Sequence, residues 1–187
     1  MKSVLISIKP KWCELIANGR KTIEVRKTKP KIETPFKVYI YETRAQCDRP
    51  IMLDFGVLDF HGRGQVIGEF VCRNMTCMQA DIDSQGEKHL YNTAFIENRM
   101  CLTDEELFNY IYDGKRNIGW AWGISDLVIY DKPKELSEFW NVDKCPYVNK
   151  NGCTYKYHCF RAGETKRCGQ QIERPPQSWC YVEESKE

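Results

Sequence analysis

The segment GRKTIEVR, residues 19–26, is the stretch of this chain that decides how its fold is interpreted. Its second half alternates in polarity. Ile23 and Val25 are predicted to point to one face of an extended strand, and Glu24 and Arg26 to the other. The glycine that opens the segment suits the residue just past a helix. The segment is therefore predicted to join a helix to a strand whose polar face carries an ion pair.

Three charged residues in this segment have side chains suited to binding or catalysis. Arg26 can hold a phosphate or a planar carbonyl edge of a base, and Glu24 can accept a hydrogen bond from an exocyclic amine. Lys21 can contact phosphate or, if desolvated, act as a base or nucleophile. Alternation does not fix the direction of Lys21, because it lies where the chain leaves the glycine. The same spacing also fits a solvent-exposed charge pair on an edge strand.

Further strands and helices are predicted on both sides of this segment. Alternating or aliphatic runs predict strands, and they cover residues 4–8, 36–42, 65–72 and 118–130. One helix is predicted to begin at Pro10 and to end before Gly19, and a capping box at Thr103 and Glu106 predicts another, while residues 79–101 receive no assignment. Strands and helices do not alternate regularly, which excludes a doubly wound parallel sheet. We expect an α+β fold: a small, mostly antiparallel β-barrel with peripheral helices.

Length and composition limit the class of protein. The chain has 187 residues, of which 42% are hydrophobic and 29% charged, so we expect a folded domain with an appendage. No apolar run is long enough for a transmembrane helix. The apolar stretch near the N-terminus meets Lys9 and Pro10 too early for a signal peptide, so we expect a cytosolic protein without membrane association.

Charge is unevenly distributed along the chain. Residues 1–44 contain eleven Lys/Arg and four Asp/Glu, a net charge of +7, whereas residues 81–113 have a net charge of −6. Residues 141–174 return to +4. The two basic regions suit a surface that faces a polyanion, or they are solvated surface lysines.

Several segments together resemble the ASCH family. Residues 19–26 resemble its hallmark G-x-K-x-x-E-x-R. Other segments that agree with the family pattern, in order, are residues 5–10, 66–70, 120–126 and 130–133. The resemblance covers residues 1–140, which we assign to an ASCH domain. ASCH domains are small β-barrels related to the PUA domain of RNA-modifying enzymes.

The resemblance implies a cleft lined by the hallmark motif, with RNA or a modified nucleotide as the ligand. Lys9, Lys21, Glu24 and Arg26 are the binding residues expected on this basis. Trp122 is the candidate ring for base stacking, because aromatic rings beside cations suit single-stranded nucleic acid. The alternative for Trp122 is a tryptophan packed in the core.

Some ASCH relatives are amidohydrolases that act on N4-acetylcytidine, and they carry a lysine at the position of Lys21. An alternative function is therefore hydrolysis of an acylated nucleoside, with Lys21 and Glu24 as catalytic residues. This chain departs from those enzymes at Glu24, where they have a threonine, and it is longer than they are.

The tail, residues 141–187, is rich in cysteine. Intervals of seven, five and eight residues separate Cys145, Cys153, Cys159 and Cys168. In a reducing cytosol such a cluster favours one structural zinc, with His158 as a substitute ligand, over free thiols or disulfides. We expect the tail to pack back on the barrel. A further alternative function is that of an adaptor whose zinc-bound tail recruits a protein.

Overall fold

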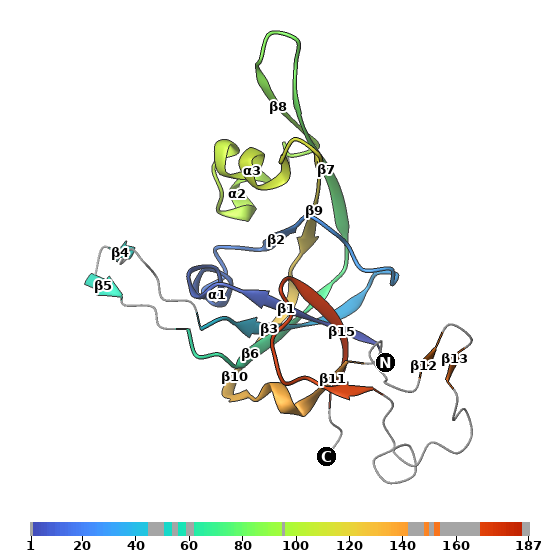
Figure 1. Ribbon diagram of the computed structural model, residues 1–187. Helices are drawn as coiled ribbons and strands as arrows, with labels where there is room; N and C mark the ends of the chain where they lie inside the picture. Colours follow the sequence, from blue (N-terminus) through green and yellow to red (C-terminus); the bar gives the residue numbers. More distant parts are fainter. Residues whose placement is uncertain are drawn as a thin grey trace.

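The computed structural model describes residues 2–44, 51–53, 56–58, 62–94, 96–141, 148–149, 152–153 and 169–184. Two sheets and a few short helices make up this part of the chain, an α+β fold with mostly antiparallel strands (Figure 1). Two small ladders complete it, and they pair β4 (Ile51–Leu53) with β5 (Gly56–Leu58) and β12 (Val148–Asn149) with β13 (Gly152–Cys153).

The larger sheet has seven strands in the order β10-β6-β3-β1-β15-β11-β14. Only the β1–β3 pair is parallel, and every other neighbouring pair is antiparallel. The first four strands in chain order are β1 (Ser3–Ile8), β3 (Phe36–Glu42), β6 (Val66–Cys72) and β10 (Ser125–Lys134). The remaining strands and the short 3-10 helix before them are η1 (Leu136–Glu138), β11 (Phe139–Asn141), β14 (Gln170–Gln171) and β15 (Trp179–Glu184).

The smaller sheet has the order β2-β9-β7-β8 and is antiparallel throughout. Its strands are β2 (Ile23–Arg26), β7 (Met75–Ile82), β8 (Lys88–Tyr91) and β9 (Ile118–Gly123). The helices are α1 (Pro10–Ala17), α2 (Glu97–Met100) and α3 (Asp104–Ile111). In Figure 1, α2 and α3 lie beside the smaller sheet, and the β7–β8 hairpin extends beyond them.

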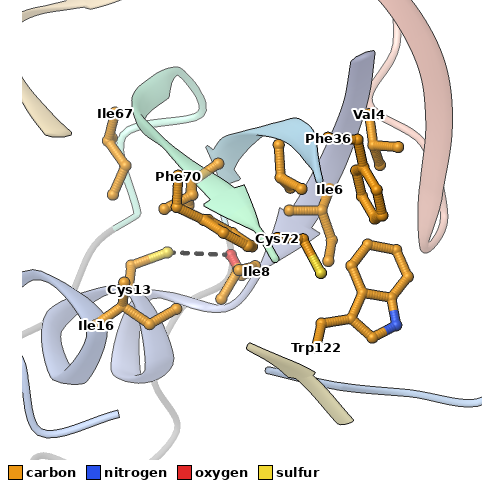
Figure 2. Packing of buried hydrophobic residues seen from close by; sticks show 12 residues of the cluster. Val4, Ile6, Ile8, Cys13, Ile16, Phe36, Ile67, Phe70, Cys72 and Trp122 are labelled. Atoms are coloured by element: carbon orange, nitrogen blue, oxygen red, sulfur yellow. Dashed lines mark hydrogen bonds between the residues drawn. The ribbon is translucent and has the colours of Figure 1, made fainter. Parts of the chain in front are cut away.

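The alternation in β2 separates two hydrophobic clusters. Ile23 and Val25 are buried in a cluster with residues of α2, α3 and β7. On the other face, Glu24 lies opposite Trp122 in the register, and Trp122 belongs to the cluster between the two sheets. The ring of Trp122 meets Phe36 edge to face, with their centroids 5.9 Å apart (Figure 2). Because the apolar face of β2 packs against α2 and α3, the charged side chains on its other face are directed toward the larger sheet.

Most predicted elements are present, and four expectations need correction. The strand at 118–130 is two strands, β9 and β10, which are separated at Ile124. Asp126, whose φ is 49°, lies within β10 where its register with β6 shifts. β10 continues to Lys134, past the predicted end at residue 130, and the unassigned stretch at 79–101 forms most of the β7–β8 hairpin and α2. The fourth is the barrel. Within the described residues the strands form open sheets, because the end strands β10 and β14 of the larger sheet do not pair with each other, and neither do β2 and β8 of the smaller one.

The C-terminal strand β15 pairs antiparallel with β1, so residues from the two ends of the chain share one ladder. Val182 in this strand is fully buried in the cluster around Phe139. A domain boundary at residue 140 stays a prediction. None of the helices in the described ranges has the length and apolar character that a membrane crossing requires.

Candidate functional site

A cavity of about 390 Å³ lies between the end of β1, helix α1, strand β2 and helix α3. It is called the central pocket below. Segments far apart in the sequence form its wall, and the lining residues are Ser7, Ile8, Lys9, Trp12, Lys21, Glu24, Val25, Arg26, Thr43, Leu102, Glu106, Tyr110 and Gln177. Four of the residues predicted from the hallmark motif and its flank, Lys9, Lys21, Glu24 and Arg26, are therefore brought together in one pocket.

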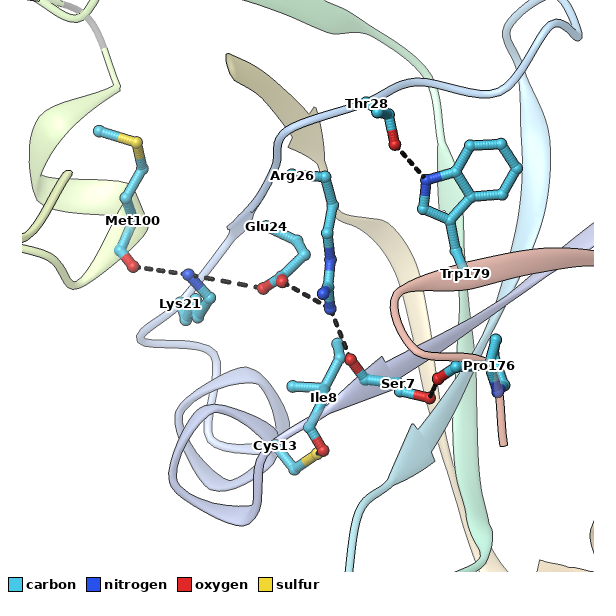
Figure 3. A network of polar contacts seen from close by, with 10 residues as sticks. All are labelled: Ser7, Ile8, Cys13, Lys21, Glu24, Arg26, Thr28, Met100, Pro176 and Trp179. Atoms are coloured by element: carbon cyan, nitrogen blue, oxygen red, sulfur yellow. Dashed lines mark hydrogen bonds and ion pairs between the residues drawn. The ribbon is translucent and has the colours of Figure 1, made fainter. Parts of the chain in front are cut away.

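Lys21 lines the central pocket and is buried, with 3% of its surface exposed. The chain leaves α1 through Gly19, whose φ of 75° favours glycine, and the Lys21 backbone N–H then bonds to the carbonyl of Leu15 at 2.8 Å. Its Nζ donates to the carbonyl of Met100 at 2.6 Å (Figure 3). This carbonyl ends α2 and has no partner within the helix, so the ammonium satisfies it. Nζ also lies 3.6 Å from Glu24 Oε2.

Arg26 extends the same group of charges toward β1. Its Nη2 lies 3.0 Å from Glu24 Oε1 and donates to the backbone carbonyl of Ser7 at 2.7 Å (Figure 3). The ion pair predicted from alternation is thus present, and it is buried rather than exposed. Arg26 Nε is buried and has no hydrogen-bond partner within the described ranges. The arginine therefore carries one buried donor that no described residue satisfies.

Lys21, Glu24 and Arg26 form a continuous charged row with one excess positive charge. Burial lowers the pKa of the Lys21 ammonium from its ordinary value of 10.5, while the Glu24 carboxylate acts in the opposite direction. A buried row of this kind can hold an anionic or polar ligand, because low-dielectric surroundings strengthen each interaction. A lysine with a lowered pKa can also release its proton near neutrality more readily than an ordinary lysine.

The rim of the central pocket adds aromatic and polar side chains that sequence reasoning missed as site residues. Trp12 on α1 is half-buried, and Lys21 Nζ lies 5.0 Å from its ring centroid. Tyr110 on α3 is 36% exposed. The only sequence signal for Trp12 is its place on the apolar stripe of the helix, which is also typical of a core residue. Gln177 carries no local signal at all.

The prediction of Trp122 as a stacking ring is wrong. This side chain has 0% exposure and packs between Phe36 and Trp179, so neither face of its ring is open to a ligand. Its place in the register opposite Glu24 directs it into the core between the sheets. The alternative weighed for it, a packed core tryptophan, is what the structure contains.

The predicted zinc ligands cannot be placed. Cys145, Cys159 and Cys168, the substitute ligand His158 and the side chain of Cys153 lie outside the described residues. Within the described ranges, no three histidine, cysteine or acidic side chains come together in a way that could hold a metal ion. The zinc therefore stays a prediction from the sequence.

Comparison with known proteins identifies relatives for this fold. A family model described as the ASCH domain matches residues 6–125. The crystal structure of ASCH from Zymomonas mobilis superposes with a TM-score of 0.54 at 16% identity, covering 97% of this chain and 87% of that one. A tyrosine-to-phenylalanine mutant of the Zymomonas protein has the same TM-score and identity, covering 98% of this chain and 91% of its own. Curated protein sequences give no match.

Proposed function

This chain belongs to the ASCH domain family, and from that premise we propose that its central pocket binds RNA or a modified nucleotide. The binding residues are Lys9, Lys21, Glu24 and Arg26. The observation that carries the proposal is the buried charged row at the wall of a pocket that also has a half-buried tryptophan at its rim.

The chemistry of the wall suits one nucleotide. Bases stack on aromatic rings, and Trp12 offers such a ring beside the ammonium of Lys21. The charged row has one excess positive charge, which favours a phosphate. The buried Nε of Arg26 gains a partner if a ligand oxygen approaches it, and satisfying a buried donor is favourable by about 1–3 kcal/mol. Glu24 supplies an acceptor for an exocyclic amine.

Binding is measured by fluorescence anisotropy of short, labelled single-stranded ribo-oligonucleotides over a range of salt concentrations. Free nucleoside monophosphates serve as competitors, and they separate binding of one nucleotide from binding of a strand. Lys9→Ala is the first variant, because Lys9 is exposed and lines the pocket, so its loss leaves the fold intact. If Lys9 contacts a phosphate, the slope of log affinity against log salt falls by about 0.7.

The matched control is Lys88→Ala, which removes an exposed lysine on the β7–β8 hairpin outside the central pocket. We expect this variant to bind like the unmodified protein. Equal loss of affinity in both variants would show that the binding is nonspecific attraction to a basic protein. Absence of binding to any oligonucleotide or nucleotide would reject the proposed function.

A second candidate function is hydrolysis of an acylated nucleoside, and the lowered pKa of Lys21 favours it. In that reaction water adds to the acyl carbonyl, and neutral Lys21 accepts the proton of the attacking water. Protonated Lys21 then donates this proton to the leaving nitrogen as the amide bond breaks, which releases a carboxylic acid and the free nucleoside amine. Incubation with N4-acetylcytidine, followed by chromatography for cytidine, tests it. Turnover that disappears in Lys21→Met supports the enzyme, and absence of turnover in the unmodified protein rejects it.

A further inference from the structure

The C-terminal segment before β15 reaches the wall of the central pocket. Ser7, the penultimate residue of β1, contacts both neighbours of Gln177. Its Oγ donates to the carbonyl of Pro176 at 2.6 Å (Figure 3), and its backbone N–H donates to the carbonyl of Ser178 at 2.9 Å. The two residues that flank Gln177 are therefore both bonded, through their carbonyls, to a single residue of β1.

The same residue connects Gln177 to the charged row. The Ser7 carbonyl accepts the 2.7 Å hydrogen bond from Arg26 Nη2, so all three polar groups of Ser7 are engaged. On the far side of the segment, Trp179 Nε1 donates to Thr28 Oγ1 at 3.0 Å, just beyond β2. The backbone on both sides of Gln177 is thus held by contacts to β1 and to the loop just beyond β2.

Gln177 differs chemically from the other polar residues that line the pocket. Lysine and arginine side chains only donate hydrogen bonds, and an ionised glutamate only accepts them. Among the described residues that line the pocket, Gln177 is the one amide, and an amide offers a donor and an acceptor side by side. Its side chain is exposed and makes no hydrogen bond to another described residue, so both groups are available to a ligand.

We propose that Gln177 contacts the edge of the base and is a specificity-determining residue of the central pocket. This inference rests on the proposed function and deepens it. The edge of a nucleobase presents donors next to acceptors, which an amide matches with two hydrogen bonds. The charged row then holds the phosphate or sugar side of the ligand, while the C-terminal segment reads the base.

The test compares oligonucleotides that have bases with a strand of equal length whose sugars are abasic. Gln177→Ala is expected to lower the affinity for base-bearing strands by about 3- to 10-fold, the equivalent of one to two hydrogen bonds. It should also reduce the differences in affinity among oligo(U), oligo(C) and oligo(A). Binding of the abasic strand should not change, because it has no base edge to contact.

Two further variants complete the test. Gln170→Ala removes an exposed glutamine of the same C-terminal segment that is absent from the pocket lining, and it should leave every affinity unchanged. Ser7→Ala removes the hydrogen bond to the Pro176 carbonyl. Its effect on affinity should not add to that of Gln177→Ala, since the Ser7 hydroxyl acts on the ligand through the position of Gln177.

The outcomes separate the inference from the function on which it rests. If the unmodified protein binds none of the strands, the proposed function fails and the inference fails with it. If the unmodified protein binds and Gln177→Ala leaves the affinities unchanged, only the inference is overturned. An equal loss for base-bearing and abasic strands also overturns it, because that pattern indicates a structural or charge effect.

Discussion

Glu24 Oε1 lies 3.0 Å from Arg26 Nη2, and the two side chains keep only 7% and 11% of their surface exposed. They stand two residues apart on β2, so strand geometry places them on one face, directed toward the larger sheet. A pair this buried is stable only if other groups satisfy the remaining polar atoms of both partners, because neither side chain is fully solvated. Glu24 meets this need because its second carboxylate oxygen forms an ion pair with Lys21.

Replacing Glu24 should therefore destabilise the protein. Glu24→Gln keeps the shape of the side chain but leaves the charges of Lys21 and Arg26 without a counterion, and we expect a loss on the order of 3 kcal/mol in the free energy of unfolding. Chemical denaturation measures it. The control is Asp126→Asn, which breaks an exposed pair with Arg73 and should cost under about 1 kcal/mol. Equal costs in the two variants would show that the charged row is solvated.

Trp12 and Trp122 should give opposite results on substitution. Trp12→Ala is expected to weaken oligonucleotide binding by about 1–3 kcal/mol, the value of one stacked base. The free energy of unfolding should change by less than the free energy of binding. Trp122→Phe should lower the thermal midpoint and leave the affinity of the folded protein unchanged, because this ring is fully buried. Anisotropy titrations and thermal melts of the same samples give both quantities. A Trp12→Ala protein that binds normally would remove this ring from the ligand site.

The sequence predicted the local parts of the site and missed those set by tertiary packing. Period-two alternation was sufficient to place Glu24 and Arg26 on one face, since a strand fixes side-chain direction by parity alone. The same rule says nothing about which face is covered, so it did not show that Trp122 is buried. Gln177 lies about 170 residues from Ser7 in sequence. No local pattern predicts a contact of that separation.

The tail should contain one zinc ion if the cysteine spacing has the meaning we assign to it. Residues 141–170 have few aliphatic side chains, so burial alone offers little to order them, and thiolate–metal bonds are available in a reducing environment. Elemental analysis of protein purified without chelator should give about one zinc per chain. Cys159→Ser should reduce that content, whereas Cys77→Ser, outside the tail, should not. A metal content far below one would contradict the prediction.

Alkaline conditions should destabilise the fold through Tyr39. Burial, with a further contribution from the charge of Glu69, raises the pKa of Tyr39 from 10.0 to about 12. The unfolded chain therefore loses this proton first, and the native state is more protonated between these values. The contribution of Tyr39 to stability should be intact below pH 10 and fall by about 2 kcal/mol as the pH rises to 12. Tyr39→Phe should reduce this fall, while Tyr91→Phe, on the exposed hairpin, should not.

Lys21 should impose a pH dependence of the opposite sign. Its pKa is lowered from 10.5 by burial, so between the folded value and 10.5 the unfolded chain binds more protons than the native state. Stability from this residue is therefore fully present above pH 10.5 and is lost as the pH falls toward the folded pKa. Lys21→Met removes the titrating group while keeping an unbranched side chain in the space beside Met100.

The measurement is the free energy of unfolding of both proteins at a series of pH values below 10, where the loss expected from Tyr39 has not begun. The unmodified protein should gain stability relative to Lys21→Met as the pH rises. The slope of the difference matters and its offset does not, because the variant also loses the hydrogen bond to the Met100 carbonyl, a cost independent of pH in this range. Parallel curves would mean that Lys21 keeps an ordinary pKa. They would also remove the observation that favours it as a proton acceptor in hydrolysis.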